Sequence, residues 1–373
     1  MTTKKVTEHS QDELRSQIMR IEFFFEFLRT VLSIVIALGI VLVIVAFITD
    51  DPLKAIQTLL MGPLKSVRVF GNVIELAIPL TFCGLAITVI FSSNRFNMAA
   101  DGAFFVGGLA GACAALAVPD APFMVKLFVG LSAGFGTGMI IGLIPALLNR
   151  FFGAWELITS LMMNYAYGFF VRYVLNRVIR NKDSISIESH PFNVDMGKLF
   201  TGTRIHYGLI IVLVLAVLVY VFMYKTRWGY ALRVTGKSEK YATYSGIKTG
   251  IVILGAQVMG AAIAGLGGAV EMFGLYQTFR WTASQGYGFD GIIISTLARN
   301  NPLFVPISAF FLSYLRIGAD VLNRSSDIPA ELMSAIQAVI ILLIAAKAFL
   351  SGYKQKAIVK QSQKFAAQGG EAE

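Results

Sequence analysis

The sequence predicts an all-α polytopic membrane protein with about 10 transmembrane helices, in a range of about 8 to 10. Composition is the first reason: 56% of the 373 residues are hydrophobic, 14% are charged, and the mean hydropathy is +0.68. Soluble globular chains carry about 25% charged residues. Long apolar windows are the second reason. Residues 30–49 form one uncharged run of the ~20 residues that span ~30 Å of hydrocarbon.

Each apolar window is expected to form one span. In chain order the windows are residues 30–49, 70–91, 97–118, 125–148, 156–176, 207–224, 251–276, 288–299, 302–319 and 330–350. The window 288–299 is short, so a broken or re-entrant helix is the alternative to a full crossing there. Together the windows make residues 30–351 a transmembrane domain.

The two ends of the chain are polar. Residues 1–29 contain the amphipathic run IEFFFEFLR and are expected on the inner membrane surface. Residues 352–373 are rich in Gln, Lys and Ala and are expected to be disordered. A signal peptide is not expected at 30–49, because a polar segment precedes this window and no small-residue cleavage site follows it.

The formal net charge of +10 does not indicate a nucleic-acid partner. The Lys and Arg residues fall in the loops and tails between spans, as the positive-inside rule predicts. Placing both termini in the cytoplasm puts the larger share of these residues on the inner side. This topology also places the polar segment 225–250 in the cytoplasm.

The sequence carries no enzyme or metal motif. Cys83 and Cys113 lie inside apolar windows and are interpreted as small buried hydrophobic residues. His9, His190 and His206 lie outside the expected spans, and the sequence has neither H-E-x-x-H nor G-x-S-x-G. No catalytic residue, metal or cofactor is therefore expected on this chain.

Asp101 opens the window 97–118 together with Asn97, although a carboxylate in hydrocarbon costs about 2.5–3.5 kcal/mol. Asp290 opens the window 288–299 in the same way, and each aspartate precedes a glycine. The two windows run in opposite directions, which favours a possible inverted repeat. We expect each aspartate to cap the helix that begins beside it. The alternative, with which capping is compatible, is that Asn97, Asp101 and Asp290 lie near a solute pathway.

Three further polar residues fall inside expected spans and are pathway candidates: Glu75, Asn164 and Tyr165. For Glu75 the alternative is a place at the outer interface. For Asn164 and Tyr165 it is hydrogen bonding between helices. Small residues at four-residue spacing, as at Gly134, Gly138 and Gly142, predict close helix packing.

Within the segment 225–250, Gly236-Lys237-Ser238 is not a phosphate-binding loop, because Ala231 stands where that motif needs glycine. Ser238 is instead expected to cap a short helix at 239–245, which Gly246 ends. Such a basic cytoplasmic helix suits docking into a groove on a partner protein.

Four stretches resemble the permease subunits of ATP-driven importers for branched-chain amino acids, ribose-like sugars and nucleosides. They are FNMAADG (96–102), WELITSLMMNY (155–165), GYALRVTGKSEKYATYSGI (229–247) and GYGFDGIIISTLARNNP (286–302). The likeness covers about residues 70–351, and the implied fold is that of type II-like importer permeases. Ala99, Asp101 and Trp155 depart from the family pattern, which typically has Gly, Glu and Asn at these positions.

The long N-terminal extension and the motif variants are most similar to nucleoside permeases, and simple sugars such as ribose are the alternative solutes. The resemblance implies a multi-pass protein of a bacterial inner membrane. Its implied partners are a second homologous permease, an ATP-binding cassette ATPase that carries ATP and Mg, and a solute-binding lipoprotein or periplasmic protein. The implied ATPase-coupling residues are Arg233, Gly236, Ser238, Ala242 and Gly246. An ion-coupled secondary carrier that uses Asp101, Glu75 or Asp290 is the alternative of a different class.

Overall fold

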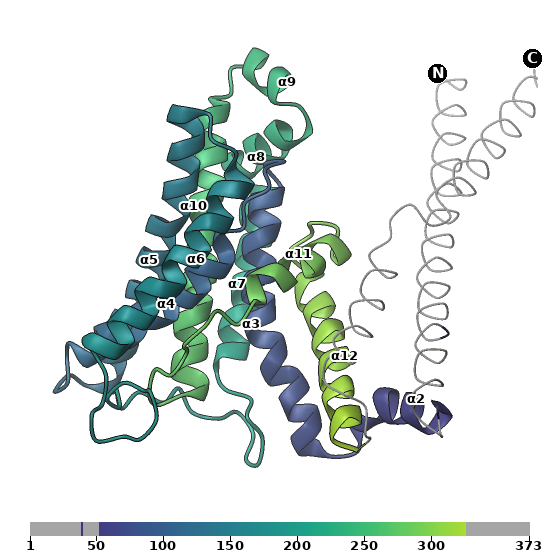
Figure 1. Cartoon of the computed structure of the whole chain (residues 1–373). Helices are drawn as coiled ribbons and strands as arrows, with labels where there is room; N and C mark the ends of the chain where they lie inside the picture. Colours follow the sequence, from purple (N-terminus) through teal and green to yellow (C-terminus); the bar gives the residue numbers. More distant parts are fainter. Residues whose placement is uncertain (1–38, 40–51, 326–373) are drawn as a thin grey trace, which may run out of the picture. The chain divides into compact units, whose positions relative to one another are not determined.

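The computed structural model describes residue 39 and residues 52–325, and their regular structure is helical (Figure 1). The helices are α2 (Pro52–Met61), η1 (Gly62–Leu64), α3 (Val67–Phe91), α4 (Ala99–Leu116), α5 (Phe123–Phe152), α6 (Glu156–Arg177), α7 (Gly208–Lys225), α8 (Arg227–Lys237), α9 (Glu239–Tyr244), α10 (Thr249–Leu275), α11 (Tyr287–Leu297) and α12 (Val305–Ser325). For these residues the predicted all-α class is confirmed. Leu59–Val321 form one compact unit, which contains all the candidate residues discussed below.

Among the described residues, 6 helices are long and apolar enough to cross a membrane: α3, α4, α5, α7, α10 and α12. The predicted span 156–176 is present as helix α6, which is not among these 6. The predicted window 288–299 forms α11, whose 11 residues extend about 16 Å. This length supports the broken-helix alternative there, because a full crossing needs about 30 Å. The predicted segments 1–29, 30–49, 330–350 and 352–373 lie outside the described residues.

Helix α10 is the centre of the compact unit and packs against α3, α4 and α5. Glycines allow this close approach. A Cβ atom added at Gly138 would lie 2.9 Å from the Cα of Ala262, and one at Gly142 would lie 2.6 Å from the Cβ of Ala261. Small residues therefore let the α5 and α10 backbones meet, which confirms the packing interpretation of this glycine series.

Helix α11 packs against the second half of α3. The Thr88 hydroxyl donates to Ser295 Oγ at 2.9 Å, and a Cβ added at Gly291 would lie 2.7 Å from the carbonyl oxygen of Cys83. Helix α12 then starts with Val305, and the side chain of this residue lies next to Gly84 of α3. Helix α11 therefore packs along α3, and α12 begins beside the same helix. Gly288, the second residue of α11, is buried against Asp101, so the start of α11 lies inside the bundle.

Helices α8 and α9 lie together where α3 and α7 end and α10 begins, which we call the α9 end (Figure 1). Ser238 Oγ accepts a hydrogen bond from Tyr241 N at 3.3 Å, and Gly246 follows α9 with φ +81. The predicted short helix, its cap and its terminating glycine are thus confirmed. Helix α8 is an element that the sequence analysis did not predict.

Candidate functional site

Asp101 lies in the first turn of α4, and its side chain is buried. Ser284 Oγ donates to its Oδ2 at 2.7 Å, and the N–H of Gly288 donates to its Oδ1 at 3.1 Å. Gly288 is the second residue of α11. The carboxylate therefore caps α11 rather than α4. The prediction that Asp101 caps its own helix is wrong because α4 begins two residues earlier, at Ala99.

The start of α4 is instead satisfied by Asn97, a fully buried side chain. Its Oδ1 accepts a hydrogen bond from Ala99 N at 2.7 Å, and its Nδ2 donates to Gln257 Oε1 of α10 at 2.6 Å. The backbone of Met98 is also held: its N–H donates to Ser160 Oγ at 2.9 Å, and its carbonyl accepts from Asn164 Nδ2 at 3.0 Å. Side chains of α6 and α10 and the first backbone N–H of α4 are thus hydrogen-bonded to the few residues before Ala99.

Asp290 lies in the first turn of α11, where Arg316 of α12 donates to its Oδ1 at 2.6 Å. No side chain caps α11 from its own N-cap position, which is Gly286 with φ +74. The expectation that Asp290 caps its own helix is therefore wrong. This carboxylate joins α11 to α12 as a partly buried ion pair.

Asn164 and Tyr165 of α6 point to different surroundings. A Cβ added at Gly102 would lie 2.5 Å from Asn164 Oδ1 and 2.7 Å from the Tyr167 ring, so Asn164 lies against the first turn of α4. Tyr165 is 70% exposed on another face of α6. The structure therefore brings Asn97, Asp101 and Asn164 together and leaves Tyr165 apart from them.

Aromatic side chains surround the start of α11. Trp281 stacks on Phe104 of α4 with ring centroids 5.6 Å apart, and Tyr287 meets the same ring edge-on at 5.3 Å. Trp281 and Ser284 belong to the connection that leads into α11, and Tyr287 is the first residue of α11. The sequence analysis missed all three, because their closeness to α4 follows from tertiary packing alone.

A second buried polar group contains His206, which the sequence analysis did not name as a site candidate. His206, just before α7, is fully buried; its Nδ1 accepts from Gly208 N at 3.1 Å, and its Nε2 lies 3.5 Å from Glu271 Oε2. Glu75 is partly buried in α3 and interacts electrostatically with Glu271 and Arg204. The predicted candidate Glu75 therefore belongs to this cluster. Within residues 52–325, no group of three or more His, Cys, Asp or Glu side chains is arranged to hold a metal ion.

The predicted coupling residues lie at the α9 end. Arg233 Nε donates to the carbonyl of Met223 at 3.0 Å, and its guanidinium lies 4.7 Å from the centroid of the Tyr224 ring. Gly236 packs directly on the carbonyl oxygen of Ser92, and Ala242 is fully buried. A cavity of about 560 Å³ opens here. It is bordered mainly by Ser92, Tyr224, Tyr230, Arg233, Lys237 and Arg299.

Comparison with known proteins matches residues 69–345 to the family described as "Branched-chain amino acid transport system / permease component". The chain is 27% identical to the nucleoside ABC transporter permease protein NupB of Lactococcus lactis subsp. cremoris (strain MG1363), over 86% of this chain and 92% of that protein. It is 30% identical to the guanosine ABC transporter permease protein NupP of Bacillus subtilis (strain 168), over 74% of this chain and 80% of that protein.

A sugar permease is also among the relatives. The glucose ABC transporter permease protein TsgB13 of Haloferax volcanii is 28% identical, over 87% of this chain and 88% of that protein. The family match covers most of the residues that form the helical bundle, including Asn97, Asp101 and Asn164. On this match and these helices, the chain is a multi-pass membrane protein and belongs to the branched-chain amino acid transport system permease family.

Proposed function

We propose that this chain is the permease subunit of an ATP-binding cassette importer and forms the transmembrane pathway for nucleosides. One observation carries the proposal: α4 and α11 both begin inside the bundle, and buried polar side chains gather where they meet. Irregular backbone at membrane depth is tolerated where it is buried in protein or lines a cavity, and broken helices mark substrate sites in transporters.

Asn97, Asp101 and Asn164 are the pathway residues of this proposal, with Ser284 and the aromatic residues Trp281 and Tyr287 added from the structure. Aromatic faces and amide groups together suit a solute with a flat ring and hydroxyl groups, such as a nucleoside. The names of two relatives support the same solute class. Simple sugars are the second candidate, supported by the glucose permease among the relatives.

The α9 end faces the cytoplasm in this proposal, and both chain termini lie on the same side. An ATPase subunit that binds ATP and Mg docks against α8 and α9, so no cofactor belongs to this chain. A second homologous permease completes the pathway within the lipid bilayer, and a solute-binding lipoprotein or periplasmic protein delivers the solute. The family match supports this division of labour.

The test is transport by the full importer reconstituted in proteoliposomes, measured across nucleosides, ribose and glucose. We expect nucleosides to stimulate ATP hydrolysis. We also expect their uptake only when ATP is present on the side of the membrane that the α9 end faces. Stimulation by sugars alone would favour the second candidate. Uptake by this chain without an ATPase, driven by a proton or sodium gradient, would contradict the proposal.

A further inference from the structure

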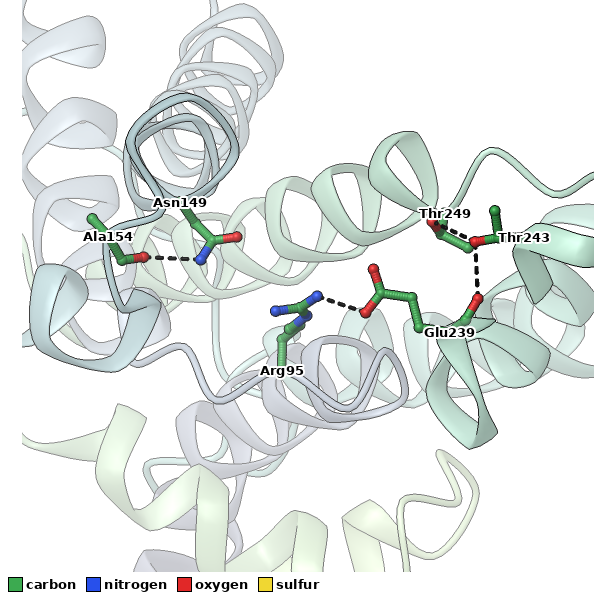
Figure 2. Close-up of polar contacts among 6 residues, drawn as sticks. All are labelled: Arg95, Asn149, Ala154, Glu239, Thr243 and Thr249. Atoms are coloured by element: carbon green, nitrogen blue, oxygen red, sulfur yellow. Dashed lines mark hydrogen bonds and ion pairs between the residues drawn. The ribbon is translucent and has the colours of Figure 1, made fainter. Parts of the chain in front are cut away.

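Helix α9 is joined to the start of α4 by an ion pair. Arg95 Nη2 lies 2.9 Å from Glu239 Oε2, and the two side chains are 31% and 51% exposed (Figure 2). Glu239 is the first residue of α9, where the positive end of the helix dipole favours a carboxylate. Arg95 belongs to the loop 92–98, which connects α3 to α4.

The position of α9 is also fixed relative to α10. Thr243 Oγ1 donates to the carbonyl of Glu239 at 2.9 Å and lies 3.4 Å from Thr249 Oγ1, the first residue of α10 (Figure 2). Helix α9 therefore has two polar attachments to the bundle: one through Thr249 and one through Arg95.

The loop 92–98 carries the same residues that organise the candidate pathway. Phe96 packs on Phe91 with ring centroids 4.9 Å apart, and Asn97 then holds Ala99 N and Gln257. Met98 binds Ser160 and Asn164 of α6 through its backbone. Arg95 therefore lies only two or three residues along the chain from the hydrogen bonds that hold α4, α6 and α10 together.

Arg95 also acts on a second carboxylate. Glu156, the first residue of α6, is buried and interacts electrostatically with Arg95 and Glu239. The guanidinium thus pairs directly with Glu239 of α9, and its positive charge also attracts the Glu156 carboxylate of α6. Reversing its charge would place three negative groups together, which favours separation of α9 from the loop.

We propose that Arg95 and Glu239 are positioning residues that couple α9 to the solute pathway through the loop 92–98. The inference rests on the proposed function, in which an ATPase moves α9. When α9 is displaced, the ion pair carries the loop with it, and Asn97 and Met98 change the relative positions of α4, α6 and α10. Neither residue touches solute in this mechanism.

The experiment uses the full importer in proteoliposomes and compares five variants: Arg95→Glu, Glu239→Arg, the double exchange, the conservative Arg95→Lys, and the matched control Arg150→Glu. Arg150 is an exposed arginine in the last turn of α5. The measured quantities are basal ATP hydrolysis, solute-stimulated hydrolysis and solute molecules taken up per ATP. Correct insertion is checked by gel filtration of each purified complex.

We expect each single reversal to lower uptake per ATP by about fivefold or more, the lower end of typical coupling between sites, while basal hydrolysis persists. The double exchange restores most of the ratio, although incompletely, because an arginine in the first turn of α9 opposes the helix dipole. Arg150→Glu keeps the wild-type ratio, and Arg95→Lys keeps most of it.

Two results would overturn the inference. One is that both single reversals take up as much solute per ATP as the wild type. The other is that the double exchange takes up no more solute per ATP than the worse of the two single variants. If a single variant does not assemble, the double exchange and Arg95→Lys still decide, because both retain opposite charges. Failure of the proposed function has a different signature, since the wild-type importer would then show no ATP-dependent uptake at all.

Discussion

Asp101 shows how a carboxylate is accommodated among apolar helices. Placing it in hydrocarbon costs about 2.5–3.5 kcal/mol, whereas each hydrogen bond to a charged acceptor contributes about 1.5–3 kcal/mol. Its bonds from Ser284 and from the Gly288 N–H are therefore enough to offset the cost. The carboxylate also lies near the N-termini of both α4 and α11, where helix dipoles favour negative charge.

Asp101→Asn and Asp101→Ala separate charge from hydrogen bonding. Asn retains an oxygen for the Gly288 N–H, so we expect an assembled bundle with a small loss of thermal stability. Ala leaves the buried Gly288 N–H without an acceptor, which costs about 1–3 kcal/mol, so we expect a lower unfolding temperature and poorer assembly. The measurement is thermal unfolding in detergent followed by gel filtration.

Asp120→Asn is the matched control, because Asp120 is exposed between α4 and α5. It should unfold at the wild-type temperature. An Asp101→Ala variant as stable as this control would contradict the capping role of the carboxylate. Normal solute-stimulated ATP hydrolysis in Asp101→Asn would show that the charge itself is not needed for transport.

At the scale of elements, α9 is a short helix with one buried residue. Ala242 is fully buried, whereas Tyr244 of the same helix is 91% exposed. Inserting a large side chain at a packed position costs about 1–3 kcal/mol. Because α9 has only 6 residues, we expect the whole helix to shift away from the bundle and so relieve this strain.

We therefore expect Ala242→Trp to insert normally in the membrane and to hydrolyse ATP without matching uptake. Tyr244→Trp is the control, since its side chain needs no room inside the protein. Uptake per ATP, measured in proteoliposomes, distinguishes the two. A wild-type ratio in Ala242→Trp would rule out the role of α9 in coupling.

The connection 178–207 is the element at the other end of α10, and it lies beside residues 273–279. Ser184 Oγ donates to Glu188 Oε1 at 2.7 Å, and Thr278 Oγ1 donates to Oε2 at 3.0 Å. These hydrogen bonds, that from Ser184 first, lower the pKa of the Glu188 carboxyl below its usual value. Because the folded-state pKa is lowered, the stabilisation is present above the ordinary glutamate pKa and is lost as the pH falls through the lowered value.

Hydrogen exchange of residues 184–189 and 278–279 tests this dependence. After correction for the intrinsic effect of pH, we expect protection to decrease as the pH falls below the ordinary glutamate pKa of about 4.3. Glu188→Gln carries no titrating group at this position and should show no such decrease. A decrease of the same size in both proteins would assign the effect to another group.

For the whole molecule, the features that could be predicted from the sequence are local ones. The apolar windows, the Ser238 cap, Gly246 after α9 and the small residues of α5 each depend on residues a few positions apart. Such patterns are set by helix periodicity and by backbone preferences, which act within a turn or two. The helical class, most helix positions and the short α9 were therefore accessible before any tertiary structure.

The partners of the polar residues were decided by tertiary structure alone. Asp101 meets Gly288 across 187 residues, Asn97 meets Gln257 across 160, and Arg95 meets Glu239 across 144. No periodicity links positions so far apart, because these contacts exist only once α10 has brought α3, α4 and α5 together. The sequence by itself determined that this chain is a bundle of apolar helices with carboxylates among them. Only the packing of those helices decided which N–H groups and cations each carboxylate meets.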